Sequence, residues 1–327
     1  MPQIEYGLCF HRTEPAGSVR YRAAAAEQQG FDEFWVIEDC FFTSGVSLAA
    51  AALTSTETIG VGIGIMPVVA RNAAMTAMEI ATLAEIAPGR LHAGLGHGVQ
   101  AWMRQMNATV ASPLTVLEET FHAVQRLLAG EQVSVQGRYV TLHQVQLDQP
   151  PSQKPLVSAG VRGPKSVEVS GRVADGVILA DFVSADYVRW VRGIVGDDHR
   201  ITVFASLAMG PVKAHGAIRE GMAGYLAEVC GGAVGTPTSL HKAPFYDEFA
   251  GQAQESSWYE AALAMPDEWL TQLVAFGTPD QAAGYVASLV EAGADAVTFF
   301  PNPDDPQNDS DYAAAELLPR LRSLSLL

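Results

Sequence analysis

The chain has 327 residues, of which 48% are hydrophobic, and its 36 acidic against 20 basic residues give a net charge of −16. This length suits one large or two modest globular domains, and no apolar run comes near the roughly 18 residues of a membrane-spanning helix. So acidic a protein repels nucleic acid and anionic lipid, which excludes both as partners. Backbone amides and a few arginines are left to hold any anionic ligand.

The amino terminus and the cysteines indicate where in the cell the protein is expected. Residues Met1 to Glu5 contain neither a basic nor an apolar segment, so we expect no secretory signal. The three cysteines show no CxxC spacing, which suits a reducing compartment. We therefore expect a cytoplasmic protein.

Strand-like and helix-like stretches alternate along the chain. Eight short apolar runs predict strands at residues 4–10, 34–37, 59–65, 91–95, 156–159, 176–180, 201–208 and 296–300. Helical spacing and capping residues predict helices at 19–29, 45–54, 72–86, 113–128, 166–171, 185–195, 281–291 and 312–324. Asn72 and Thr278 are the expected N-caps of two of them. This alternation predicts an α/β fold, a (β/α)8 TIM barrel in one domain spanning residues 1–327, rather than an open sheet.

Two excursions interrupt the alternation. Residues 132–135 and 138–141 around Gln136-Gly137 predict a small hairpin within an excursion of 131–142. From 211 to 277 the pattern loosens into several helices, a segment long enough to be a lid or a subunit contact.

Glycines gather at the ends of two central strands. Gly60, Gly62 and Gly64 alternate and so share one face of a strand, where they either make room for packing inside the barrel or face a ligand. Gly96-His97-Gly98 after the next strand predicts a loop whose backbone comes close to a ligand. It is not a dinucleotide fingerprint, because no helix opens directly from these glycines.

A second candidate loop, Gly160-Val161-Arg162-Gly163-Pro164-Lys165, lies between the fifth strand and the next helix. Glycines before a proline in the first helical turn describe a helix N-terminus open to an anion, and Arg162 and Lys165 add positive charge. The alternative is an ordinary loop with two solvated cations.

Polar side chains follow the second strand, at the end where α/β barrels place their chemistry. Glu38, Asp39 and Cys40 are adjacent, so we expect only one of the two carboxylates to face the pocket and no carboxylate pair. His97 is expected either to contact a cofactor or substrate or to make a supporting hydrogen bond, whereas His92 is expected to be packed or outward-facing. No HxH or HExxH spacing and no Ser-His-Asp set is found, so we expect no metal site.

The carboxyl ends of the predicted strands bring the candidate residues to one face, in one largely apolar pocket. Its expected lining is Phe10, His11, residues 38–40, Ile65, Met66, residues 96–98, residues 160–163 and Asp181.

A family resemblance runs over nearly the whole chain. The motifs that carry it are Phe31-Asp-Glu-Phe-Trp-Val-Ile-Glu-Asp39, Gly62-Ile-Gly-Ile65, Glu79-Ile-Ala-Thr-Leu83, Pro88-Gly-Arg-Leu91 with Gly94-Leu-Gly96, Arg172-Val-Ala-Asp-Gly176 and Gly277-Thr-Pro279. Together they resemble the bacterial-luciferase-like superfamily of flavin- and deazaflavin-dependent oxidoreductases. The two candidate loops look more like the coenzyme F420 branch, which includes methylenetetrahydromethanopterin reductases, than like the FMN monooxygenases.

The resemblance implies a cofactor site and catalytic residues. Gly64-Ile65 matches a non-prolyl cis peptide behind the central ring of the cofactor, with Met66 next to it. The cofactor's ribityl chain and phosphate would lie on Gly96, His97, Gly98, Ala159, Gly160, Val161 and Gly163, and its acidic tail would be drawn outward by Arg162 and Lys165. The candidate catalytic residues are His97, Asp39, Glu38 and Cys40.

The implied activity is hydride transfer between coenzyme F420 and a small organic substrate, for which the cofactor supplies the reactivity and the protein the orientation. The resemblance also implies a homodimer and a separate reductase or dehydrogenase that regenerates the reduced cofactor. Cys40 stands where several relatives carry a histidine, and Val99 lies near the glutamate of sugar-phosphate dehydrogenase relatives, so a sugar phosphate is not the expected substrate. The alternatives are an FMN-dependent monooxygenase that uses reduced flavin and O2, a hydrolase or isomerase, and a non-catalytic barrel.

Overall fold

The computed structural model describes residues 4–180, 182–209, 212–231, 238–302 and 304–324. Its centre is a closed barrel of eight parallel strands, which confirms the predicted (β/α)8 fold. The strands are β1 (Glu5–Phe10), β2 (Glu33–Ile37), β3 (Gly60–Pro67), β4 (Leu91–Gly96), β7 (Leu156–Gly160), β8 (Gly176–Leu179), β9 (Arg200–Met209) and β11 (Ala296–Phe300). Neighbours pair in this order, and β9 pairs with both β8 and β11, which closes the ring.

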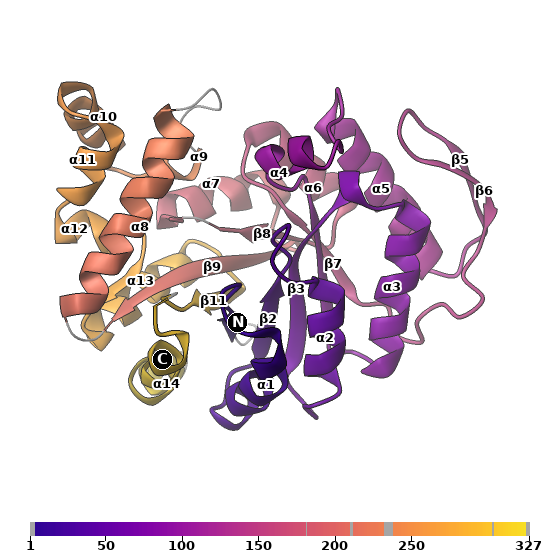
Figure 1. Cartoon of the computed structure of the whole chain (residues 1–327), viewed down its shortest axis with the longest axis horizontal. Coiled ribbons are helices and arrows are strands. Elements are labelled where there is room, and N and C mark those ends of the chain that lie inside the picture. The colour runs from indigo at the N-terminus through magenta and orange to yellow at the C-terminus, as the bar shows by residue number, and fades with distance from the viewer. Residues whose placement is uncertain (1–3, 181, 210–211, 232–237, 303, 325–327) are drawn as a thin grey trace.

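Helices surround the barrel, as Figure 1 shows. They are α1 (Val19–Gln28), α2 (Gly45–Leu53), α3 (Ala73–Ile86), α5 (Pro113–Leu128), α6 (Pro164–Val173), α7 (Ala185–Val195), α13 (Pro279–Glu291), α14 (Pro306–Tyr312) and α15 (Leu318–Leu324). Both expected N-caps are confirmed. The Asn72 side chain accepts from the Ala74 N–H at 2.9 Å, and Thr278 forms a capping box with Gln281.

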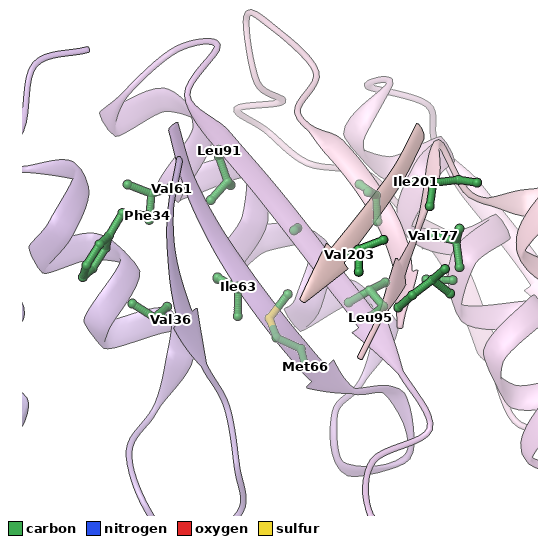
Figure 2. Packing of buried hydrophobic residues seen from close by; sticks show 14 of the residues in the cluster. Phe34, Val36, Val61, Ile63, Met66, Leu91, Leu95, Val177, Ile201 and Val203 are labelled. Carbon is green, nitrogen blue, oxygen red and sulfur yellow. The ribbon is translucent and has the colours of Figure 1, made fainter. Parts of the chain in front are cut away.

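Two hydrophobic clusters follow from the alternation of side chains along each strand. Phe34 and Val36 of β2 belong to the large cluster between the sheet and the helices, whose members along β2, β3, β4, β8 and β9 are drawn in Figure 2. Trp35 and Ile37 point the other way, into a smaller cluster inside the barrel that also includes Phe204 of β9.

The glycines of β3 face this interior cluster. A Cβ on Gly62 would lie 2.1 Å from the Trp35 ring, and one on Gly64 would lie 3.0 Å from the Phe204 ring. Both distances are shorter than ordinary van der Waals contact, so these two positions must lack a side chain for the aromatic rings to fit. The packing interpretation of the alternating glycines is therefore the one that the structure supports.

The predicted hairpin exists, but its second strand lies later in the chain than expected. The strands are β5 (Val133–Gln136) and β6 (Thr141–Val145), so residues 138–140 belong to the turn. The carboxylate of Glu119 on α5 accepts from the backbone N–H groups of Arg138, Tyr139 and Val140, at 2.8 to 2.9 Å. A helix carboxylate thus takes the donors that a strand partner would otherwise bind.

Helix boundaries near the C-terminus also differ from expectation. The closing helix begins at Pro306 rather than 312, because Asp305 is an N-cap that accepts from the Asn308 N–H and Pro306 occupies the first turn. Helix α6 likewise begins at Pro164 rather than 166, and the short helix α4 (Gln100–Gln105) was not predicted.

The excursion between β9 and α13 folds around a hydrophobic cluster of its own. It contains α8 (Val212–Gly231), α9 (Thr238–His241), α10 (Tyr246–Glu255), α11 (Trp258–Leu263), α12 (Asp267–Leu270) and β10 (Ala275–Gly277). Met222, Phe249 and Trp269 are members of the cluster, which meets the barrel at Ala208 of β9. Figure 1 shows α8 and α10 to α12 together at one side of the barrel. Among the described helices, none has the length and apolar character to cross a membrane.

Candidate active site

Strand β3 carries an irregularity at its carboxyl end. The Gly64-Ile65 peptide is cis, which confirms the prediction for this bond. The register between β3 and β4 shifts between Ile63 and Met66, so β3 bulges where it reaches the mouth of the barrel.

The parallel register brings the three predicted cofactor segments together. Pro67 of β3 lies opposite Gly96 of β4, and Gly96 lies opposite Gly160 of β7. Because these positions all lie at the carboxyl ends of their strands, the bulge and the two glycine loops form one continuous rim of the mouth.

The Ile65 side chain fills the space that three of the glycines leave open. A Cβ added to Gly94, Gly96 or Gly160 would lie 2.6 to 2.8 Å from its carbon atoms. Gly98, at φ +69°, faces Met103 and Pro67 in the same way. Gly94, Gly96 and Gly160 thus pack against half-buried Ile65, and the contact of their loops with a ligand stays a prediction.

His97 joins the two loops. Its Nε2 lies 3.0 Å from the Ser166 hydroxyl in the first turn of α6. Burial lowers the pKa of His97, and the Pro113 carbonyl only partly opposes this effect. The imidazole is therefore neutral near pH 7 and fixed in place by Ser166.

The loop from β7 to α6 ends in a helix N-terminus with open space in front of it. Gly163 is the N-cap, Pro164 follows, and a Cβ on Gly163 would meet no atom within 4 Å. Lys165 is exposed, but Arg162 is not a simple solvated cation, since its guanidinium donates to the hydroxyl of Tyr225 on α8. Ala159 and Val161 are buried in the large cluster. This N-terminus could hold an anion.

The two carboxylates after β2 bind different arginines. Glu38 accepts from the Gly45 N–H at the start of α2 (2.9 Å) and pairs with Arg71 at 2.6 Å, and its side chain is 10% exposed. Asp39 pairs with Arg12 at 2.6 Å and is 24% exposed. Glu38 is thus held at the start of α2, which favours Asp39 as the carboxylate that faces the mouth.

Cys40 and the aromatic residues after it complete this side of the mouth. Burial, with the charges of Glu38 and Asp39, raises the pKa of the Cys40 thiol, so the thiol is protonated. Phe41 and Phe42 are 68% and 51% exposed, and the Arg12 guanidinium lies 4.9 Å from the Phe42 ring centroid.

The structure supports His11 as a site residue more strongly than the sequence does. It is 5% exposed, its ring centroid lies 5.1 Å from that of Phe300 in an edge-to-face arrangement, and its Nδ1 accepts from the Thr13 backbone N–H at 3.2 Å. That bond leaves the proton of the neutral ring on Nε2. Burial, followed by the charge of Arg12, lowers the pKa of His11 to about 4. The available sequence signal was its place directly after β1, two residues beyond inward-facing Cys9.

The remaining residues are some that the sequence predicted and some that it missed. His92 was expected to be either packed or outward-facing. It is packed inside the barrel, with its Nε2 2.6 Å from the Ser158 hydroxyl. Asp181, an expected lining residue, lies outside the described residues. Arg12 and Tyr225 were missed, and Tyr225 had no local signal because its role depends on how the excursion folds. Within the described part of the chain, no group of three His, Cys, Asp or Glu side chains could hold a metal ion.

A closed (β/α)8 barrel with a bulged third strand, two loops at its mouth and an open helix N-terminus defines a class of barrel proteins that bind ligands at the carboxyl ends of their strands. A family model described as Luciferase-like monooxygenase matches residues 7–296, and the chain belongs to this family.

Three comparisons refine this placement. A 5,10-methylenetetrahydromethanopterin reductase of Methanolobus tindarius is 33% identical over 176 residues, about half of each chain (54% of both). The protein of the same name from Archaeoglobus fulgidus is 23% identical over 98% of this chain and all of its own length. The solved coenzyme F420 dependent tetrahydromethanopterin reductase of Methanopyrus kandleri superposes with a TM-score of 0.80 at 18% identity, covering 98% of this chain and 99% of that one.

Proposed function

We propose that this protein is an oxidoreductase that transfers a hydride between coenzyme F420 and a small organic substrate. The observation that carries the proposal is the rim formed by the Gly64-Ile65 bulge, residues 96–98 and residues 160–163. It occurs in a chain similar over most of its length to two proteins named as F420-dependent dehydrogenases. The fold alone would not fix the chemistry, which depends on the residues of the rim.

The residues of the rim fit a flavin-type group. Half-buried Ile65 offers an apolar surface for a planar ring, whereas Met66, also predicted to contact the cofactor, is fully buried in the large cluster between the sheet and the helices. The uncapped start of α6 at Gly163 and exposed Lys165 offer a positive end for a phosphate. When bound, a reduced deazaflavin supplies a hydride, and the protein supplies position and polarity.

The other half of the mouth is left for the substrate. Phe300 ends β11, and His11 and Arg12 follow β1. Asp39 and exposed Phe42 follow β2. We propose that Asp39 and His97 are the polar groups next to the reacting carbon. The aromatic side chains favour an organic substrate with an apolar part.

The alternative is an FMN-dependent monooxygenase, which the name of the matching family favours. The discriminating experiment is a fluorescence titration of the purified protein with F420 and with FMN, together with an absorption spectrum of the protein after filtration. We expect F420 to bind more tightly, and Arg162→Glu to weaken it. FMN that binds at least as tightly, or an unchanged Arg162→Glu variant, would favour the monooxygenase.

We propose a homodimer that pairs through α3. Of the alanines at 23–26 in α1 and 49–52 in α2, which would also allow close packing between subunits, those at 23, 26, 49 and 52 are buried and the other four are half-buried. Helix α3 instead exposes Met75, Met78 and Ile86, which are 51%, 46% and 45% exposed and fall on one helical face. Met78→Glu should convert a dimer into a monomer in light scattering at micromolar concentration, whereas the charge-matched control Gln254→Glu on α10 should not. A monomeric wild type would contradict this proposal.

The proposed activity also requires turnover of the cofactor. A hydride carrier that leaves the reaction oxidised or reduced must be restored, so we propose a separate reductase or dehydrogenase as a functional partner, and a cytoplasmic location for both. Addition of such an enzyme should allow many turnovers per bound cofactor. Turnover limited to one equivalent in its presence would contradict the proposal.

A further inference from the structure

His11 lies where the interior of the barrel opens into the mouth. Along β1 the Cys9 side chain belongs to the interior cluster and the Phe10 side chain to the large cluster outside the sheet, so the alternation places His11 on the interior side. Phe300 of neighbouring β11 packs against the interior cluster and meets the His11 ring edge to face. Ile65, the proposed support of the cofactor ring, packs against the same cluster. His11 and the bulge of β3 therefore border one chamber.

The His11 imidazole is held at one nitrogen. Nδ1 accepts from the Thr13 backbone N–H at 3.2 Å and lies 2.7 Å from the Thr13 hydroxyl. Since Nδ1 accepts, the proton of the neutral ring is on Nε2, and burial keeps the ring neutral by lowering its pKa to about 4. The backbone is held as well, because the His11 N–H donates at 3.0 Å to the Glu14 carboxylate, which pairs with Arg22 at 2.8 Å.

The opposite nitrogen, Nε2, is the open end of the ring. In the part of the chain that the structure describes, the hydrogen bonds of the imidazole are those at Nδ1, and none is made by Nε2. Nε2 is also not one of the fully buried unpaired polar atoms, which include Nδ1 of His92 and Nδ1 of His97, so it keeps contact with solvent. A neutral N–H group that is oriented and open at the end of a barrel strand is suited to bind an oxygen atom of a ligand.

We propose that His11 is a catalytic residue, which donates a hydrogen bond from Nε2 to the oxygen of a carbonyl substrate while the hydride adds to the neighbouring carbon. This inference rests on the proposed function and names its substrate class: carbonyl compounds with an apolar part, or the corresponding alcohols in the reverse direction. Thr13 is a positioning residue, because it acts on the substrate only through the His11 ring.

The physical reason is the charge that develops on the oxygen. As the hydride forms the new C–H bond, the π electron pair of the C=O bond moves onto the oxygen, and a water molecule in the mouth supplies the proton that completes the hydroxyl group. A donor that is already oriented stabilises this charge without a cost of reorganisation, and a neutral imidazole can polarise a carbonyl group in this way. An iminium substrate has no oxygen at the reacting carbon and would gain nothing from His11.

The kinetic test compares two probes that differ in the reacting group. Acetophenone carries a carbonyl oxygen, whereas the N-methyl dihydroisoquinolinium cation is an iminium without one, and the oxidation of reduced F420 by each is followed by absorbance. His11→Leu should lower kcat for acetophenone about 10²–10³-fold, the loss typical of a missing oxyanion donor, with less change in KM. His11→Gln, which keeps an N–H donor, should retain more activity than His11→Leu. The iminium probe should be reduced more slowly by wild type, at a rate that His11→Leu leaves unchanged.

Thr13 and an exposed histidine provide the matched variants. Thr13→Val removes the hydroxyl but leaves the backbone N–H, and should lower kcat for acetophenone by about 2–10-fold, which corresponds to one hydrogen bond. Thr13→Ser, which keeps the hydroxyl, should restore most of that loss. His143→Leu removes an exposed imidazole from hairpin strand β6 and should leave kcat and KM unchanged.

NMR of protein labelled with 15N at histidine tests the contact without turnover. His11 should be in the Nε2–H tautomer at pH 7. Its Nε2–H resonance should move downfield when acetophenone is added in the presence of oxidised F420, because the carbonyl oxygen accepts from it. Ethylbenzene, which has the same ring but no oxygen, should not cause this change.

The inference and the proposed function fail in different ways. An unchanged kcat for acetophenone in His11→Leu, or an Nε2–H resonance that acetophenone does not move, would overturn the inference. So would a wild type that binds F420 but does not reduce acetophenone. These outcomes leave the proposed cofactor in place, because F420 binding is measured separately by fluorescence titration. If wild type does not bind F420, the proposed function is wrong and the inference is overturned with it.

Discussion

Replacement of Gly62 with alanine would test how tightly the barrel interior is packed under the proposed site. The new Cβ would lie 2.1 Å from one carbon of the Trp35 ring and 2.2 and 2.4 Å from two others. The indole would have to retreat until these distances reach the 3.4 Å of ordinary contact.

The surroundings of Trp35 resist that movement. The ring is fully buried, its Nε1 donates to the Glu33 carboxylate at 2.9 Å, and its faces and edges meet His92 and Phe204 at centroid distances of 4.7 and 5.1 Å. Overpacking a core costs about 1–3 kcal/mol, and a weakened hydrogen bond to a charged group adds about 1.5–3 kcal/mol. We expect Gly62→Ala to lower the free energy of unfolding by about 3 kcal/mol or more.

Gly60 offers a control on the same strand and the same face. A Cβ there would meet its nearest atom, the Asp32 carbonyl oxygen, at 3.4 Å, so Gly60→Ala should change the unfolding free energy by less than about 1 kcal/mol. Urea unfolding followed by tryptophan fluorescence measures both variants. Equal midpoints for Gly62→Ala and Gly60→Ala would refute the packing argument.

Three further predictions concern the site and its pH dependence. Alanine at Asp39 or at His97 should lower turnover by about 10²–10⁴-fold and change cofactor affinity less, and unchanged turnover in steady-state kinetics would remove that residue from the mechanism. The imidazole of His11 should stay neutral between roughly pH 5.5 and 8, because burial lowers its pKa to about 4; an NMR titration midpoint near the usual 6.5 would contradict this. Burial raises the pKa of Asp309 from 3.8 to about 6. Its carboxylate also accepts a hydrogen bond from the Asn302 N–H, which by itself would lower the pKa. The folded state therefore binds an extra proton, stability falls as the pH rises through 6, and Asp309→Asn should stabilise the protein at pH 8 more than at pH 5 in thermal melts; a pH-independent difference would count against it.

The fold was predictable because its signals are local and repeated. Each β-strand is a short apolar run buried on both faces, and each surrounding helix carries its own apolar face or its own caps, such as Asn72 and Thr278. One error occurred where a distant residue overrides the local pattern, whereas the starts of α6 and of the closing helix were missed at local signals, Pro164 and Asp305-Pro306. The hairpin turn moved because Glu119, about 20 residues earlier, binds three N–H groups of residues 138–140. No periodicity in 131–142 contains that information.

The candidate site also has a part that local sequence signals predict and a part that depends on distant residues. Once the strand order is known, parallel pairing alone places Pro67 beside Gly96 and Gly96 beside Gly160, so the rim could be predicted from sequence. The side-chain contacts at the rim could not be predicted from sequence, because they depend on side chains from other elements.

Arg12, Arg71 and Tyr225 show why those contacts escape the sequence. Each reaches its partner from a loop or an excursion, and each partner, Asp39, Glu38 or Arg162, looked like a free charged group in its own segment. A charged residue directly after a buried strand is therefore evidence for where the mouth lies but not for whether its charge is available. Arg162 has a partner, Tyr225, that comes from outside the barrel repeat. For that reason, differences in the excursion between related barrels should alter the surroundings of Arg162 and of the loop that precedes α6.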